Sequence, residues 1–389
     1  MPAISKRGEE LPESAIRKLV PYAEKAKSMG RKVYHLNIGQ PDIKTPQHAI
    51  ERIRNFNFDL IPYGHSFGNE TYRNKLAQYY RDRNLEVDAS QILITTGGSE
   101  AISFAFMVCF NPGEEVIILA PFFVEYKFYI DNHGGVPVEA WTNHETFQLD
   151  IDSIKNAITH KTRAILICSP NNPTGVIYPE ESLRQLGAVL MKIHKDNGHL
   201  IYVISDEPYA RIAFDGRHVP NIFPLVESSI IVTSHSKDLA LPGERIGYLS
   251  ANPRMDTAMQ FMEGAVFSNR VLGFVNAPAL MQRLVAKLQD ESVDIAEYQA
   301  KRDLLVSELT GMGFSMVKPD GAFYLFPRSP ITDDVAFVKL AQKHHILLVP
   351  GAGFGAPGFF RIAYCVDKGI IERSLPAWRT LAKEVGLKG

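Results

Sequence analysis

The chain has 389 residues, of which 45% are hydrophobic and 22% charged, and its formal net charge is −1. These values are ordinary for a globular enzyme of two domains, and the balanced charge without a basic tract argues against nucleic acid as a partner. No apolar run approaches the ~20 residues of a membrane-spanning helix, and the charged N-terminal stretch contains no hydrophobic targeting core.

Residues 45–290 show the pattern of an α/β domain, and a shorter stretch precedes them. A short helical pattern runs from about Pro12 to Gly30, and a turn follows at Gly39-Gln40-Pro41-Asp42. From about residue 45 to 290, short apolar strands alternate with longer amphipathic helices, which predicts a large domain with a mostly parallel sheet sandwiched by helices. The expected strands are Ile92–Thr96, Val116–Ala120, Val136–Glu139, Arg163–Cys168, Leu200–Ser205, Ile230–Ser234 and Ile246–Ser250.

The pattern changes after residue 290. A long helix is expected over roughly Glu291–Gly311 and a closing helix from about Ile370 to Val385. Short strands between them predict a smaller α+β domain, formed by residues 1–44 together with residues 291–389. The strands expected there are Phe314–Lys318, Ala322–Phe326, Ile346–Val349 and Phe359–Ala363.

Ligands of open parallel sheets bind beyond the carboxyl ends of the strands, and here Lys237 follows the apolar strand Ile230–Ser234. A desolvated lysine titrates low enough to attack a carbonyl carbon and form a Schiff base. Arg245 stands eight residues further on, where its guanidinium and the serines around Lys237 could hold a phosphate. These residues suggest a pyridoxal phosphate anchor, and the alternative is a solvated loop.

A second strand end offers a phosphate site. Gly97-Gly98-Ser99-Glu100 follows the strand Ile92–Thr96 and opens a helix over Ala101–Phe110. Small residues at such a turn expose backbone N–H groups at the positive end of a helix. The alternative is a plain tight turn in which Ser99 caps the helix.

Three more strand ends carry chemically informative residues. Asp206 follows a buried strand, where a carboxylate needs a cation such as a protonated pyridine nitrogen, unless it caps a helix. Tyr209 lies close behind it and could reach the ring hydroxyl. The loop Asn171-Asn172-Pro173-Thr174-Gly175 presents an amide rigidly. An aromatic residue of Pro121–Tyr126 could stack on a planar ring or pack in the core.

The order of these motifs resembles a known family. Asn171–Gly175, Ser205–Tyr209, Ser234-x-Ser236-Lys237 and Pro242-Gly243-x-Arg245-Ile246-Gly247-Tyr248 match, at family spacing, the class I/II pyridoxal phosphate-dependent aminotransferases. These enzymes have the aspartate aminotransferase fold (fold type I), and the resemblance covers nearly the whole chain. It implies pyridoxal 5'-phosphate as cofactor, bound to Lys237 as a Schiff base.

The resemblance also implies roles for the other site residues. Lys237 transfers the proton, Asp206 pairs with the pyridinium nitrogen, and Asn172 and Tyr209 bond the phenolic oxygen. Phe123 stacks on the ring. The residues implied around the phosphate are Gly98, Ser99, Glu100, Ser234 and Arg245.

Substrate and partner residues follow from the same resemblance. Arg361 matches the arginine that binds the substrate carboxylate, with Gly39 and Asn172 beside it. Tyr63 matches a tyrosine that family members lend to the phosphate site of the neighbouring subunit. We therefore expect a homodimer with shared active sites, acting on an amino acid and a 2-oxo acid.

The chain departs from the family pattern at three positions. Phe123 stands where aspartate-specific members usually have tryptophan, and Tyr72 stands where a leucine is usual. Arg270 is about one residue out of register with the arginine that grips a distal carboxylate. Specificity for dicarboxylates is therefore open, and the sequence assigns neither the amino acid nor the oxo acid.

The leading interpretation is an aminotransferase that moves an amino group from an L-amino acid to a 2-oxo acid by a ping-pong mechanism. A β-lyase or a cyclopropane-forming enzyme similar to ACC synthase would use the same cofactor site. A sensor domain of a transcription regulator would normally need a DNA-binding module, and none is visible in the ~40 residues before the large domain. Gly351-Ala352-Gly353-Phe354-Gly355 opens no helix of a β-α-β unit, which argues against a nicotinamide enzyme.

Cysteine usage bears on the compartment. Cys109, Cys168 and Cys365 stand in apolar settings and none has metal-ligand spacing. This pattern predicts buried, reduced thiols and no metal site. We therefore expect a cytoplasmic protein without a membrane partner.

Overall fold

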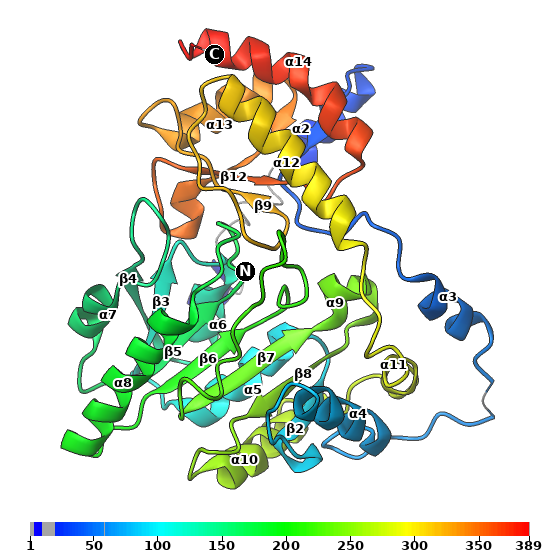
Figure 1. Ribbon diagram of the computed structural model, residues 1–389, viewed down its shortest axis with the longest axis vertical. Helices are drawn as coiled ribbons and strands as arrows, with labels where there is room; N and C mark the ends of the chain where they lie inside the picture. The colour runs from blue at the N-terminus through cyan, green and yellow to red at the C-terminus, as the bar shows by residue number, and fades with distance from the viewer. Residues whose placement is uncertain (1–3, 10–19, 58, 389) are drawn as a thin grey trace.

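The computed structural model describes residues 4–9, 20–57 and 59–388. Its lower part in Figure 1 is built on a large sheet, and its upper part combines the C-terminal helices with short strands. The helices are α1 (Lys6–Glu9), α2 (Val20–Ser28), α3 (Gln47–Arg54), α4 (Glu70–Arg81), α5 (Gly98–Cys109), α6 (Glu125–Asn132), α7 (Ile151–Ala157), α8 (Glu180–Asn197), α9 (His235–Asp238), α10 (Ala258–Val271), α11 (Ala279–Val285), α12 (Ile295–Gly311), α13 (Asp334–Lys343) and α14 (Lys368–Glu384).

Seven strands form the large sheet in the order β2-β8-β7-β6-β5-β3-β4. β8 runs antiparallel to both of its neighbours, β2 and β7, and every other pairing in the sheet is parallel, so the mostly parallel sheet predicted from the sequence is confirmed. The strands are β2 (Ile92–Thr95), β3 (Glu115–Ala120), β4 (Val136–Trp141), β5 (Thr162–Cys168), β6 (Tyr202–Asp206), β7 (Ser229–Ser234) and β8 (Gly247–Ala251).

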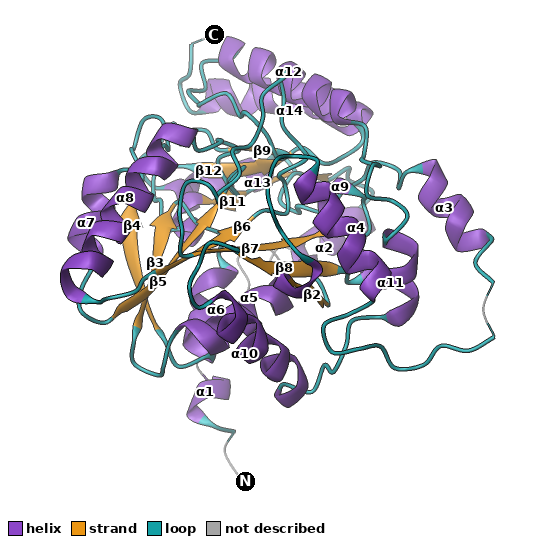
Figure 2. Ribbon diagram, turned by 60° about the horizontal axis from the view of Figure 1, so that its bottom comes forward, coloured by secondary structure: helices purple, strands orange, loops and turns teal. Residues whose placement is uncertain are grey.

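The apolar strands read as continuous runs because helices cover both faces of the sheet. In β5, Ala164 and Leu166 belong to one core cluster and Ile165 and Ile167 to the other, as the alternation of strand side chains requires. Figure 2 shows α5, α6 and α10 together on one side of the sheet, and α4, α7, α8 and α11 contribute to the cluster on the other side. The sandwiched sheet is therefore the main core of the chain.

The upper part contains short strands that pair over long sequence distances. β1 (Tyr34–His35) pairs in parallel with β10 (Ile346–Leu347), which joins the N-terminal segment to the C-terminal part. A separate antiparallel sheet has the order β11-β12-β9. Its strands are β9 (Tyr324–Leu325), β11 (Val349–Pro350) and β12 (Phe360–Ala363).

Three expectations for this part need correction. Phe314–Lys318 is not a strand: its apolar residue Phe314 packs against Phe337, Phe360 and Trp378, so the pattern reports burial and not pairing. The strand expected over Ala322–Phe326 shrinks to β9. The strand expected over Ile346–Val349 is divided between β10 and β11, because its two halves pair in different sheets.

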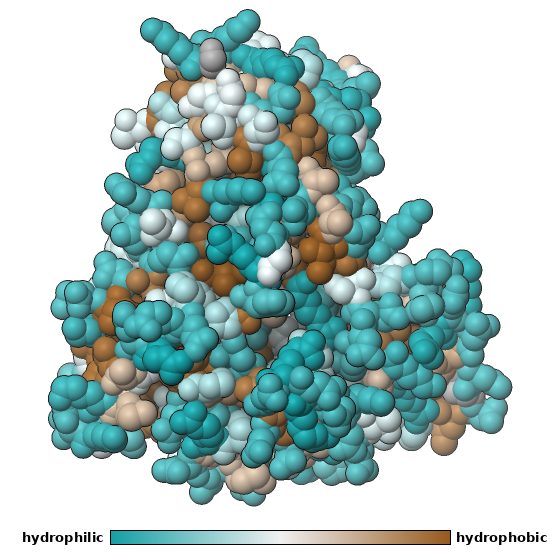
Figure 3. All heavy atoms as spheres, in the orientation of Figure 1, coloured by the Kyte–Doolittle hydropathy of each residue, from teal (hydrophilic) through white to brown (hydrophobic). Residues whose placement is uncertain are grey.

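The helices after residue 290 agree with the expectation within a few residues, since α12 and α14 lie where the two helices were predicted. At the N-terminus, α2 confirms the described end of the Pro12–Gly30 pattern, and residues 12–19 lie outside the described residues. On the face seen in Figure 3, hydrophilic side chains predominate, and hydrophobic ones gather where the upper part meets the lower part. Within the described residues, no helix is both long and apolar enough to cross a bilayer.

Candidate active site

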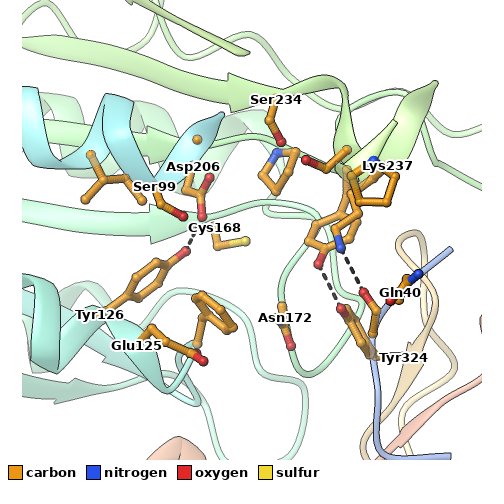
Figure 4. A pocket seen from close by; sticks show the side chains of 18 of the residues that line it. Gln40, Ser99, Glu125, Tyr126, Cys168, Asn172, Asp206, Ser234, Lys237 and Tyr324 are labelled. Atoms are coloured by element: carbon orange, nitrogen blue, oxygen red, sulfur yellow. Dashed lines mark hydrogen bonds between the residues drawn. The ribbon is translucent and has the colours of Figure 1, made fainter. Parts of the chain in front are cut away.

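A pocket of about 350 Å³ lies where the carboxyl ends of the sheet strands meet the upper part of the molecule. Residues that follow β2, β5, β6 and β7 line it from below, as expected for ligand sites of parallel sheets. The pocket brings together most of the side chains predicted from the sequence (Figure 4). These are Gly39, Gly98, Ser99, Phe123, Asn172, Asp206, Tyr209, Ser234, Lys237, Arg245 and Arg361.

Lys237 projects into the pocket from α9, the short helix that begins directly after β7. Its Nζ donates a hydrogen bond to the carbonyl oxygen of Gly39 at 2.8 Å. Burial lowers the pKa of Lys237 to about 8, and the nearby cations Arg361 and Arg245 act in the same direction. A substantial fraction of this amine is therefore neutral near pH 8, as a nucleophilic or basic lysine requires.

Asp206 is the last residue of β6 and is 8% exposed. Burial raises its pKa to about 6, and the hydroxyl of Tyr126, which donates to Oδ2 at 2.5 Å, opposes that rise. Residues 208–211 form turns and not a helix, so Asp206 does not cap a helix. A buried carboxylate at this position is suited to a cationic ligand group.

The turn after β2 places backbone N–H groups at the start of α5. Gly97 precedes this helix with φ of 84°, and a Cβ there would lie 2.7 Å from Nη2 of Arg245. Ser99 lies within the first turn of α5, so it is not the capping residue, and its Oγ accepts a hydrogen bond from Tyr129 at 3.2 Å. The glycine turn and the Arg245 guanidinium together form a cradle for an anion.

Arg361 lies on β12 and is 1% exposed. Its Nη1 donates to Oδ1 of Asn172 and its Nη2 to the carbonyl oxygen of Asn37, both at 2.9 Å. Among the described residues no carboxylate pairs with it, and its buried Nε has no hydrogen-bond partner. A buried guanidinium with spare donors is a ready partner for a ligand carboxylate.

Two tyrosines of the site were missed by the sequence reasoning. Tyr126 holds Asp206, and the hydroxyl of Tyr324 lies 2.8 Å from that of Tyr209. Tyr324 also explains the glycine at position 39, since a Cβ at Gly39 would overlap its hydroxyl. The signal for Tyr126 was its place in the aromatic motif after β3, whereas Tyr324 lay unremarked in an expected strand.

Other predicted residues lie elsewhere or play a different part. Phe123 lines the pocket with its ring edge-on to Tyr126, at a centroid distance of 5.5 Å. Glu100 is buried in α5 and does not line the pocket, and burial raises its pKa. Tyr63 is 89% exposed and outside the pocket, in the segment between α3 and α4. Arg270 is exposed at the end of α10 and does not line the pocket either.

The comparisons with known proteins agree on one family. The model of "Aminotransferase class I and II" matches residues 31–375. An aspartate aminotransferase of Bacillus subtilis is 32% identical, over 96% of this chain and 97% of that protein. An aspartate/prephenate aminotransferase of Thermus thermophilus is 31% identical, over 96% of this chain and 97% of that protein.

Solved structures give the same result. An aminotransferase from Eubacterium rectale superimposes with a TM-score of 0.95 at 34% identity, covering 99% of this chain and 100% of that chain. The aspartate aminotransferase of Thermus thermophilus with maleate gives a TM-score of 0.84 at 28% identity, covering 98% and 100%. This chain therefore belongs to the class I and II aminotransferases and has their α/β fold, fold type I.

Proposed function

We propose that this aminotransferase uses pyridoxal 5'-phosphate to move an amino group from an L-amino acid to a 2-oxo acid by a ping-pong mechanism. The observation that carries the proposal is one pocket that holds a half-buried lysine of lowered pKa, a buried aspartate and a buried arginine that pairs with no carboxylate of the described residues. A lysine, an anion cradle and a pyridinium partner are what this cofactor needs.

The residues present fit the cofactor. The pocket volume of about 350 Å³ lies within the range of small-molecule sites. The cradle of Gly97, Gly98 and Arg245 suits a phosphate, and Asp206 suits a protonated ring nitrogen, which would favour the ionised carboxylate. Phe123 supplies an apolar ring face, and Tyr209 and Asn172 supply polar groups for a phenolic oxygen.

When bound, pyridoxal phosphate supplies an electron-withdrawing ring and a carbonyl carbon that carries the amino group between the two half-reactions. Lys237 would hold this carbon through its amine in the resting enzyme. Once the incoming substrate amine has displaced it, the freed Nζ would accept the proton from the substrate Cα, which requires the neutral amine. Asp206 holds a proton on the ring nitrogen. Arg361 fixes the substrate carboxylate and so orients the Cα–H bond.

Isotope transfer tests this function. Holoenzyme incubated with each of a panel of ¹⁵N-labelled L-amino acids should retain the label on the protein, and a 2-oxo acid added after desalting should leave with it. Release of the label as free ammonia during the first incubation would instead indicate a β-lyase. Retention of no label with any amino acid of the panel would contradict the proposal.

We also propose a homodimer in which Tyr63 reaches the phosphate of the neighbouring subunit. The supporting observations are that Tyr63 is 89% exposed and that its neighbours Leu60 and Ile61 are 71% and 49% exposed in the same segment. Exposed apolar side chains in such a group are typical of an interface. A fully active monomer in sedimentation experiments would rule this out.

We also make proposals about the domain boundaries and the cellular location of the protein. We propose that residues 45–290 form the large domain and that residues 1–44 and 291–389 form the small one, supported by the pairing of β1 with β10.

We propose a cytoplasmic location, supported by Cys109, Cys168 and Cys365, which are buried and free of disulfides. Limited proteolysis that released a fragment with other boundaries, or fractionation into an oxidising compartment, would contradict these two points.

A further inference from the structure

A polar network lies behind Lys237, on the side of α9 that faces away from the pocket. Tyr72 is fully buried on α4, and its hydroxyl lies 2.7 Å from Nε2 of His235. His235 is the first residue of α9, two positions before Lys237. Tyr72 therefore contacts the helix that carries Lys237.

The network continues through the other ring nitrogen of His235. Nδ1 lies 3.0 Å from the carboxylate of Asp238, the last residue of α9, and Nε of Arg211 lies 3.6 Å from the same carboxylate. Burial alone would raise the pKa of Asp238, but His235 and Arg211 hold it below its ordinary value. This geometry fits a proton on Nδ1 donated to Asp238, which leaves Nε2 to accept the hydroxyl proton of Tyr72.

Helix α9 needs such support because it has only four residues, and so short a helix has little stability of its own. Past its end the backbone is strained, since Ala240 and Arg245 have φ of 49° and 50°. His235 and Asp238 lie three positions apart and so share one face of the helix. That face borders a second cavity of about 710 Å³, which leaves less side-chain packing to hold it.

We propose that Tyr72, His235 and Asp238 are positioning residues that fix α9 and thereby keep the amine of Lys237 buried in the pocket. The proposal rests on the role given to Lys237 under the proposed function. In this account Lys237 meets the reacting atoms, and the network acts on them only through the backbone of α9. Its loss lets water reach Lys237, which moves the titration of that amine towards ordinary lysine.

The variants separate positioning from general stability. Tyr72→Phe removes only the hydroxyl that contacts His235. Its matched control is Tyr80→Phe, since Tyr80 is a buried tyrosine of the same helix whose hydroxyl contacts Tyr248 at 3.1 Å and no residue of α9. If Tyr72→Phe does not fold, His235→Asn serves instead, because it keeps a donor towards Asp238 and loses the contact with Tyr72.

The first readout uses the protein without cofactor. Acetic anhydride labelling across a pH series, followed by peptide mass spectrometry, gives the pH midpoint at which Lys237 becomes reactive. We expect Tyr72→Phe to raise this midpoint by about half a pH unit, while Tyr80→Phe leaves it at the wild-type value. Both variants should lower the melting temperature by a similar amount, on the order of a few degrees.

The second readout uses the holoenzyme and the amino-acid and oxo-acid pair that gives wild-type turnover. We expect Tyr72→Phe to lower kcat about fivefold with KM nearly unchanged, as for a misplaced proton-transfer group. A wild-type midpoint and wild-type kcat in Tyr72→Phe would overturn the proposal, as would equal changes in Tyr80→Phe. Failure of wild-type holoenzyme to carry its cofactor on Lys237 would instead refute the proposed function, so the two failures are distinguishable.

Discussion

Two regions of the molecule contain desolvated cations, and they differ in whether these cations have carboxylate partners. On α12, the side chain of Lys301 is fully buried and pairs with Asp42 and Glu297 at 3.0 and 2.8 Å. Its neighbour Arg302 is equally buried and pairs with Asp215 and Asp303 at 2.8 Å each. Each cation on α12 therefore has two carboxylate partners.

The pocket supplies no such partners. Lys237 donates to the carbonyl oxygen of Gly39, and Arg361 donates to Asn172 and to the carbonyl oxygen of Asn37. Within the described part of the chain, neither cation forms an ion pair. A buried charge without a counter-charge costs stability. Two unpaired cations in one pocket are therefore expected where a ligand supplies the anionic groups that bind them. The difference separates a structural ion-pair network from a binding site.

The largest expected effect comes from Lys237→Ala. This change removes a largely desolvated amine that forms no ion pair within the described residues, so the protein without cofactor should fold at least as well as the wild type. Turnover should nevertheless fall by about 10⁴-fold, because the proton-transfer group is gone. Cofactor bound by phosphate and ring contacts should remain, as seen by absorbance after gel filtration. Retained turnover would place the reactive amine elsewhere.

The comparison is sharpest between the two arginines. Arg361→Lys keeps the charge but loses the fork of donors, so we expect kcat/KM to fall by about 10²-fold, through both KM and kcat, with the cofactor spectrum unchanged. Arg302→Met should leave kcat and KM intact and lower the free energy of unfolding by about 1–3 kcal/mol. Stopped-flow half-reactions and thermal melts measure the two effects. A lowered melting temperature with unaltered amino-acid affinity in Arg361→Lys would make that arginine structural.

The smallest effect concerns stability and pH in the protein without cofactor. Because burial lowers the pKa of Lys237 from 10.5 to about 8, the unfolded chain holds a proton between these pH values that the folded chain does not. The melting temperature of the wild type should therefore rise with pH from 8 to 10.5 relative to Lys237→Ala, on the order of a few degrees. If the melting temperatures of the two proteins depended on pH in the same way, Lys237 would be solvated in the folded protein.

The large sheet was predictable because all of its strands except the edge strand β4 are buried on both faces, which leaves a nearly continuous apolar run in the sequence of each. The two-residue strands were not, since β1 and β10 acquire their pairing only when distant segments meet. The motif at each strand end could likewise be predicted from local sequence, whereas the side chains that hold the motif residues in place could not, because they come from distant positions. Tyr126 reaches Asp206 from 80 positions away, and Tyr72 reaches His235 from 163.

The resemblance to the aminotransferase family assigned roles to residues whose function the motif spacing alone left open. Arg361 lies in an ordinary apolar strand sequence. Its place in the pocket and the lack of an acidic partner among the described residues distinguish it from Arg302. The alternative of a helix cap for Asp206 was equally consistent with the sequence until the turns after β6 were seen. Local pattern thus located the residues, and tertiary contacts decided between their possible roles.

The most direct test of the central claim is where the cofactor becomes attached. Holoenzyme prepared with pyridoxal 5'-phosphate is reduced with borohydride, digested and mapped by mass spectrometry. The account predicts a cofactor adduct on the peptide that contains Lys237 and none on the peptide that contains Lys301, which is fully buried and paired with carboxylates. An adduct on any other lysine, or no adduct at all, would contradict the claim that the unpaired cations of the pocket are the binding groups of the enzyme.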